Sequence, residues 1–151
     1  MELLYRGTKD GDGSNIFHNK CDNQGPTICL FKNEKGNIFG AYSSISWTSD
    51  NKYHSSKGSF LFTLTNIYGT TLTKFPNTQY YENAVYHKSN YGPTFGGNHD
   101  LYICNNYLTN SSGAYLGNSF PDILGKGDSV FSGNTNTGNF KLKELEVFKL
   151  I

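Results

Sequence analysis

The chain has few charged residues, and its positive and negative charges nearly balance. Lys, Arg, Asp and Glu make up only 17% of the 151 residues, and the formal net charge is +1. A nucleic-acid-binding domain usually carries a clustered excess of Lys and Arg, and an acidic interaction tail needs a run of like charges. The charge pattern therefore favours neither a nucleic-acid partner nor an acidic tail.

Metal-binding and membrane-spanning patterns are also missing. Cys21, Cys29 and Cys104 are an odd number without a CxxC pair, which indicates neither a disulfide framework nor a zinc site. The acidic run at 10–14 lacks the later ligands of an EF-hand calcium loop. No apolar run reaches the roughly 20 residues of a membrane span, and no signal peptide is evident. We therefore expect an intracellular, cytoplasmic protein with no disulfide, metal or other cofactor.

Aromatic and turn-forming residues are abundant. Eleven Tyr, eleven Phe and seventeen Gly accompany many Asn, Ser and Thr, a mixture that suits strands and tight turns. Runs at 27–32, 38–43 and 59–64 predict strands, the first two joined as an antiparallel hairpin, and one short helix is predicted at about 14–22. The pattern predicts a single β-rich domain, all-β to α+β, in which two antiparallel sheets pack as a sandwich.

Other segments fit a regular pattern less well. Residues 105–139 are mostly Gly, Asn, Ser and Thr, which predicts long loops. In the expected strand 140–151 both faces mix charged and apolar residues. A bulge between Glu144 and Glu146 would turn one acid outward, so we expect one of the two to be partly buried and hydrogen-bonded. Trp47 is expected to be a packing anchor.

The most specific stretch is a glycine-rich turn at 92–100 that runs into an apolar strand. Its shape and chemistry depend on Gly92, Phe95, Gly96, Gly97, Asn98, His99 and Asp100. Gly96, Gly97 and Asn98 all tolerate positive φ. A phosphate loop would need a lysine and a following helix, whereas here a strand follows. We therefore expect a structural turn that presents Asn98 and His99 on a rigid rim to a protein partner.

A carboxylate is the strongest acceptor for the backbone N–H groups of such a turn. We expect Glu146, or Glu144 if a bulge shifts the register, to accept hydrogen bonds from the N–H groups of residues 96–98. This contact would tie the last strand to the turn.

No catalytic residue is expected. The candidates for chemistry are the three cysteines, the four histidines, Asp100, Glu144 and Glu146. His99 and Asp100 are adjacent at the start of a strand and point to opposite faces, so they do not form an acid/base pair. Cys104 lies in the expected apolar strand at 101–104, next to Ile103, a setting typical of a buried and inert thiol.

Several short motifs, in order along the whole chain, resemble the TLDc domain. They lie at residues 4–7, 17–23, 25–27, 37–40, 46–48, 60–62, 92–100 and 143–148. One departure is Asn98, which stands where the family usually has a third consecutive glycine, and Asn is the best non-glycine residue at positive φ. The resemblance implies a sandwich of two antiparallel sheets flanked by short helices. It also implies one domain over residues 1–151 that forms the C-terminal part of a longer protein.

The resemblance implies a non-catalytic protein-interaction domain. The family is associated with resistance to oxidative stress and, in several members, with binding and regulating the vacuolar proton ATPase, so peripheral subunits of that enzyme are the expected partners. Two other classes stay open: a lectin-like carbohydrate-binding module, suggested by the Tyr-, Asn- and Gly-rich loops, and a peroxide-handling or hydrolytic enzyme. Fold analogy alone does not decide among them.

Overall fold

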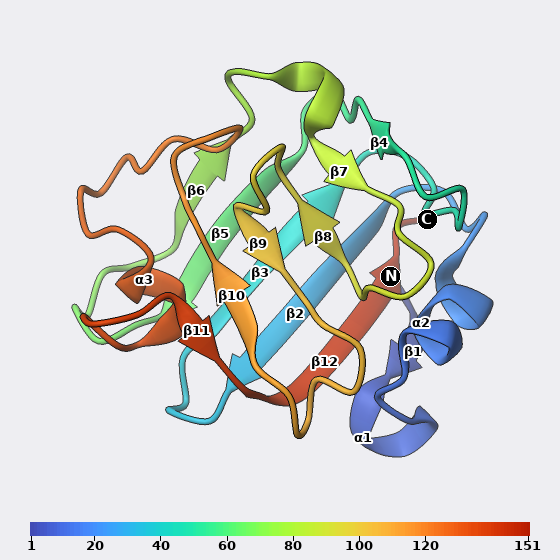
Figure 1. The fold of residues 1–151 in the computed structure, drawn as a ribbon, viewed down its shortest axis with the longest axis horizontal. Coiled ribbons are helices and arrows are strands. Elements are labelled where there is room, and N and C mark those ends of the chain that lie inside the picture. The colour runs from blue at the N-terminus through green and yellow to red at the C-terminus, as the bar shows by residue number, and fades with distance from the viewer.

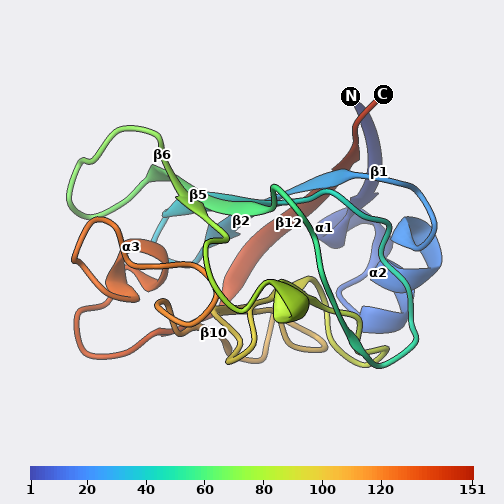
Figure 2. The same cartoon turned by 90° about the horizontal axis from the view of Figure 1, so that it is seen from above.

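The computed structural model describes residues 1–151 as two antiparallel β-sheets that pack face to face. The first sheet has the strand order β1-β12-β2-β3-β5-β6 and the second has the order β11-β10-β9-β8-β7-β4. The second sheet lies in front of the first in Figure 1, and Figure 2 shows the two as separate layers. The predicted β-rich sandwich is confirmed.

The first sheet is made of the longer strands. They are β1 (Glu2–Arg6), β2 (Thr27–Asn33), β3 (Ile38–Ser43), β5 (Phe60–Thr65), β6 (Thr73–Pro76) and β12 (Leu142–Lys149). The strands predicted at 27–32, 38–43 and 59–64 correspond to β2, β3 and β5. The predicted hairpin is confirmed, because β2 and β3 pair antiparallel with Ile28 opposite Tyr42.

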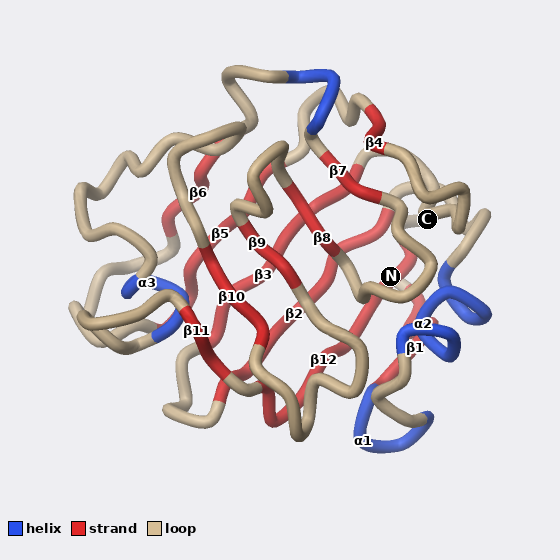
Figure 3. Tube along the Cα trace, in the orientation of Figure 1, coloured by secondary structure: helices blue, strands red, loops and turns tan.

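The second sheet is made of very short strands. They are β4 (Tyr53–His54), β7 (Val85–Tyr86), β8 (Thr94–Phe95), β9 (Leu101–Tyr102), β10 (Ser112–Ala114) and β11 (Asn139–Phe140). The sheets are flanked by α1 (Gly7–Asp10), α2 (Ser14–Cys21), α3 (Ser129–Ser132) and a 3-10 turn, η1 (Tyr81–Asn83) (Figure 3). Residues 105–139, expected as loops, thus also contain β10 and α3. None of these helices has the length and apolar character that a membrane span requires.

The C-terminal segment 140–151 is divided between the sheets, since β11 belongs to the second and β12 to the first. The register of β12 against β2 shifts between Leu142 and Glu144, earlier than expected. Beyond this shift Leu145 faces the core, while Glu144 and Glu146 are both half-buried on the outer face. Because segment 140–151 passes from one sheet to the other and its register shifts, no single alternation of polar and apolar residues fits its sequence.

Trp47 is the anchor of the core between the sheets. It is fully buried, and its ring is edge-on to Phe17 of α2, with 5.6 Å between ring centroids, and to Phe95 of β8, with 5.4 Å. The indole N–H donates to the hydroxyl of Thr27 in β2 at 3.0 Å. Trp47 therefore joins α2 to both sheets, which confirms the predicted packing role.

Candidate functional site

The turn at 92–100 is organised around the carboxylate of Asp100. Asp100 is fully buried, and its Oδ2 accepts hydrogen bonds from the backbone N–H groups of Asn118, Ser119 and Phe120, each at 3.0 Å. Burial raises the pKa of Asp100, and these N–H groups oppose the rise. Because these partners are all donors, the ionised carboxylate fits the site. Asp100 thus fastens the turn to the segment that precedes α3.

Glycine is required at position 96. Gly96 has a φ of +92°, and a Cβ there would overlap the carboxylate of Asp100. The other left-handed residue of the turn is His99, with a φ of +56°, and not Gly97 or Asn98 as the sequence suggested. Asn98 is exposed and His99 is half-buried, so both residues expected at a rim do lie at the surface.

The expected link between the C-terminal glutamates and the turn is wrong. Glu146 accepts a hydrogen bond from Nε of Arg6 at 2.8 Å, and Glu144 accepts one from the backbone N–H of Thr8 at 3.1 Å. Both glutamates lie on the outer face of the first sheet, whereas the turn belongs to the second. The carboxylate that holds the turn is supplied from within it, by Asp100.

His99 stands among tyrosines on the outer face of the second sheet. Its ring centroid lies 5.7 Å from that of Tyr86, 5.8 Å from that of Tyr91 and 5.5 Å from that of Tyr102. Tyr53 stacks on Tyr86 at 4.2 Å. Burial lowers the pKa of His99, which keeps its ring neutral at pH 7. We call Tyr53, Tyr86, Tyr91, His99 and Tyr102 the tyrosine cluster.

The first sheet carries a row of apolar side chains across its outer face. The apolar row takes one residue from each strand, paired in register: Leu3, Phe148, Ile28, Tyr42, Phe60 and Pro76. Beside it, Leu64 and Leu72 are 40% and 61% exposed, and both line an apolar surface hollow of about 220 Å³. Figure 2 shows no helix over this face. A solvated sheet face is normally polar, so the apolar row is unusual for a face that no helix covers.

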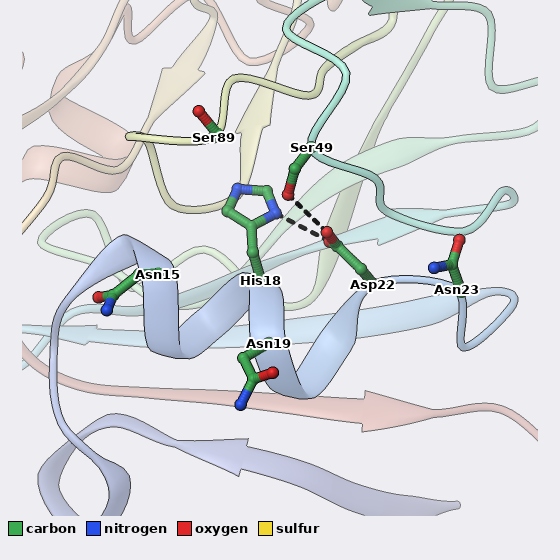
Figure 4. A pocket seen from close by; sticks show the side chains of 7 residues that line it. All are labelled: Asn15, His18, Asn19, Asp22, Asn23, Ser49 and Ser89. Carbon is green, nitrogen blue, oxygen red and sulfur yellow. Dashed lines mark hydrogen bonds and ion pairs between the residues drawn. The ribbon is translucent and has the colours of Figure 1, made fainter.

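A polar hollow of about 470 Å³ lies beside α2 (Figure 4). It is lined by Asn15, His18, Asn19, Asp22, Asn23, Ser49 and Ser89. Nδ1 of His18 is 2.8 Å from the carboxylate of Asp22, and its Nε2 lies 3.0 Å from the carbonyl oxygen of Lys88 and 2.9 Å from that of Tyr91. Asp22 also accepts a hydrogen bond from the hydroxyl of Ser49 at 2.6 Å. Because these groups satisfy one another, the hollow is a structural junction between α2 and two loops.

Comparison with known proteins identifies the family. A family model described as the TLDc domain matches residues 1–151, the whole chain. The chain belongs to the TLDc family. A zebrafish (Danio rerio) protein, MTOR-associated protein MEAK7, is 32% identical over 62 residues, and the match covers 41% of this chain and 14% of MEAK7. The chain thus spans only a small part of MEAK7, a protein whose name records an association with MTOR.

The three cysteines of this TLDc domain are free and buried. Burial raises the pKa of the Cys21, Cys29 and Cys104 thiols. A raised pKa lowers the fraction of thiolate, which is the form that attacks peroxides and disulfides. The cysteines therefore lack the exposure and the charge state of a redox centre.

We expect Ellman's reagent to modify none of the three cysteines within minutes in the native TLDc domain, because each thiol is buried and protonated. All three are expected to react once the chain is unfolded in urea. The absorbance of the released thiolate measures both rates. A thiol that reacts as fast in the native chain as in the unfolded chain would contradict this description.

Sequence reasoning missed the apolar row of this TLDc domain. The alternation in β5 places Phe60, Phe62 and Leu64 on one face, but either face of a single strand can be the inner one. The complete burial of Leu61 and Thr63 identifies the other face as the inner one. A row across six strands depends on pairings between distant segments, for which a local pattern carries no signal.

Proposed function

We propose that this TLDc domain is a non-catalytic regulatory module that binds another protein through the outer face of its first sheet. The observation that carries the proposal is the apolar row, which crosses every strand of that sheet. Removal of apolar surface from water is the main driving force of protein association, and large exposed apolar patches are typical of protein-binding sites.

Charged side chains stand in the neighbouring row of the outer face, on one side of the apolar row. At the β12 end of that neighbouring row Glu146 pairs with Arg6, and Glu144 is the next outward side chain along β12. At its β6 end the amino group of Lys74 lies 4.4 Å from the ring centroid of Phe60. An apolar centre with a polar rim is the usual composition of a protein interface. The matching partner surface is apolar at its centre and carries charges of both signs at its edge.

For the partner we propose a peripheral subunit of the vacuolar proton ATPase, and for the cellular role we propose resistance to oxidative stress. Both follow from the family resemblance of the sequence motifs. The zebrafish relative is named for an association with mTOR, which supports a role in protein binding. The burial of all three cysteines favours protection through a partner over direct peroxide chemistry by a thiol.

Two exposed leucines allow the apolar row to be tested without disturbing the core. A double variant, Leu64→Asp with Leu72→Asp, places two charges beside the row. Ile123→Asp is the matched control, since Ile123 is also exposed, at 52%, and lies outside the first sheet. In biolayer interferometry with the purified peripheral sector of the vacuolar ATPase, we expect the double variant to bind about 30-fold or more weakly. The control is expected to bind like the wild type.

The possible outcomes test the proposed surface and the proposed partner separately. Equal affinities of wild type, double variant and control would contradict the proposed surface. A loss of binding in Tyr102→Ser, with full binding by the leucine variant, would assign the contact to the tyrosine cluster instead. Failure of the wild type to bind the ATPase sector would contradict that partner. Circular dichroism melting curves of each variant verify that the fold is retained.

A further inference from the structure

Asp50, His54 and His87 come together at the free edge of the second sheet. Asp50 precedes β4, His54 ends it, and His87 follows β7, the strand that pairs with β4. One potential ligand atom from each residue lies within 4.8 Å of the others. Nε2 of His54 is 2.7 Å from Oδ2 of Asp50, and the rings of His54 and His87 are 4.2 Å apart between centroids.

His87 has a ring nitrogen without a partner. The residue is fully buried, and its Nδ1 contacts the hydroxyl of Thr48 at 2.8 Å. Its Nε2 is also buried and has no hydrogen-bond partner. Leaving such a group unpaired lowers the stability of the fold, so its presence in a folded chain needs a reason. The hydrogen bond between Asp50 and His54 does not explain it, because that bond leaves Nε2 of His87 without a partner.

The hydrogen bonding of His87 suits a metal ligand. When Nδ1–H donates to the hydroxyl of Thr48, Nε2 keeps its lone pair. Histidines that ligate metals usually donate the other ring N–H to an oxygen in this way, which fixes the tautomer and orients the ring.

We propose that Asp50, His54 and His87 bind a divalent transition-metal ion of the Zn²⁺ class. Two imidazoles and one carboxylate are a common ligand set for such ions. Tetrahedral Zn²⁺, with bonds of about 2.0–2.1 Å, needs ligand atoms about 3.3 Å apart. The ligand atoms lie within 4.8 Å of one another, so the Asp50 and His54 side chains, which are 37% and 31% exposed, have to rotate to reach that spacing. The same exposure leaves coordination positions open to water or to a donor from a partner.

A bound ion would hold the edge strand β4 against β7. Tyr53, also in β4, belongs to the tyrosine cluster, so the ion would fix one end of that cluster as well. The site lies in the second sheet, whereas the apolar row lies in the first. Metal binding is therefore tested independently of the proposed function.

The test is isothermal titration of the untagged, chelator-treated chain with Zn²⁺. We expect one ion per chain and a melting temperature that rises with Zn²⁺. Asp50→Asn and His54→Gln are each expected to weaken binding more than about tenfold. His99→Asn is the matched control: it removes a histidine from the same sheet, Asn tolerates the positive φ of that position, and binding is expected to be unchanged.

A second measurement detects metal binding at His87 without a substitution of that residue. In long-range ¹H–¹⁵N spectra of the imidazoles, we expect Zn²⁺ to shift the ring nitrogens of His54 and His87 and to leave those of His18 and His99 unchanged. Absence of Zn²⁺ binding overturns the proposal. So does binding that survives both ligand variants, or binding that shifts only His18 or His99.

Discussion

Replacing Asp100 by alanine is expected to lower the free energy of unfolding by about 3–4 kcal/mol. The substitution removes the acceptor for the backbone N–H groups of Asn118, Ser119 and Phe120 and leaves them buried near an empty space. Chemical denaturation followed by Trp47 fluorescence measures the loss. Hydrogen exchange at the three amides is expected to become much faster than at amides of β2, because the damage is local to the turn.

Asp100→Asn is the matched variant. The amide keeps the size of the side chain and one acceptor oxygen, but its NH₂ group opposes N–H donors. We therefore expect a loss smaller than that of the alanine variant. An alanine variant within about 1 kcal/mol of the wild type would contradict the role of Asp100 as the centre of the turn.

Replacing Trp47 by alanine is expected to lower the free energy of unfolding by about 3–5 kcal/mol, which is the usual cost of such a cavity. Trp47 is fully buried between α2 and the two sheets, in contact with Phe17 and Phe95. The substitution also leaves the buried hydroxyl of Thr27 without its indole donor. Urea denaturation followed by far-ultraviolet circular dichroism measures the loss.

Two controls separate packing from hydrogen bonding. Trp47→Phe keeps an aromatic ring but removes the N–H donor, so about 1–2 kcal/mol is expected. Tyr81→Ala removes a ring that is 56% exposed, and a change within about 0.5 kcal/mol is expected. If Trp47→Ala is no more destabilising than Tyr81→Ala, Trp47 is not the anchor of the core.

The sequence predicts the parts of the fold that depend on neighbouring residues. Strands β2, β3 and β5 are long enough to show apolar runs or alternation, and α2 places Phe17 and Cys21 on one buried face. The glycine turn was also located correctly, since Gly96 does adopt positive φ. These features follow from local periodicity and turn chemistry.

The second sheet and the sites depend on long-range pairing. Strands such as β8 and β9 have two residues each, too few to show a period. The partners of Glu146 and Glu144 are Arg6 in β1 and Thr8 in α1, more than 130 residues earlier, and no local signal points to them. Neither a cysteine pair nor a calcium-loop spacing describes the Asp50, His54 and His87 set, which the pairing of β4 with β7 brings together.

Hydroxyl-radical footprinting shows which face of the domain lies against its partner. The chain is oxidised alone and in the complex in which it is purified from cells. Mass spectrometry then measures the modification of each side chain. We predict that Leu72, Phe60 and Tyr42, in or beside the apolar row, are protected in the complex, while Ile123 and Tyr102 are modified as in the free chain. Protection confined to Tyr102 and the rest of the tyrosine cluster, with Leu72 and Phe60 still oxidised, would contradict the account.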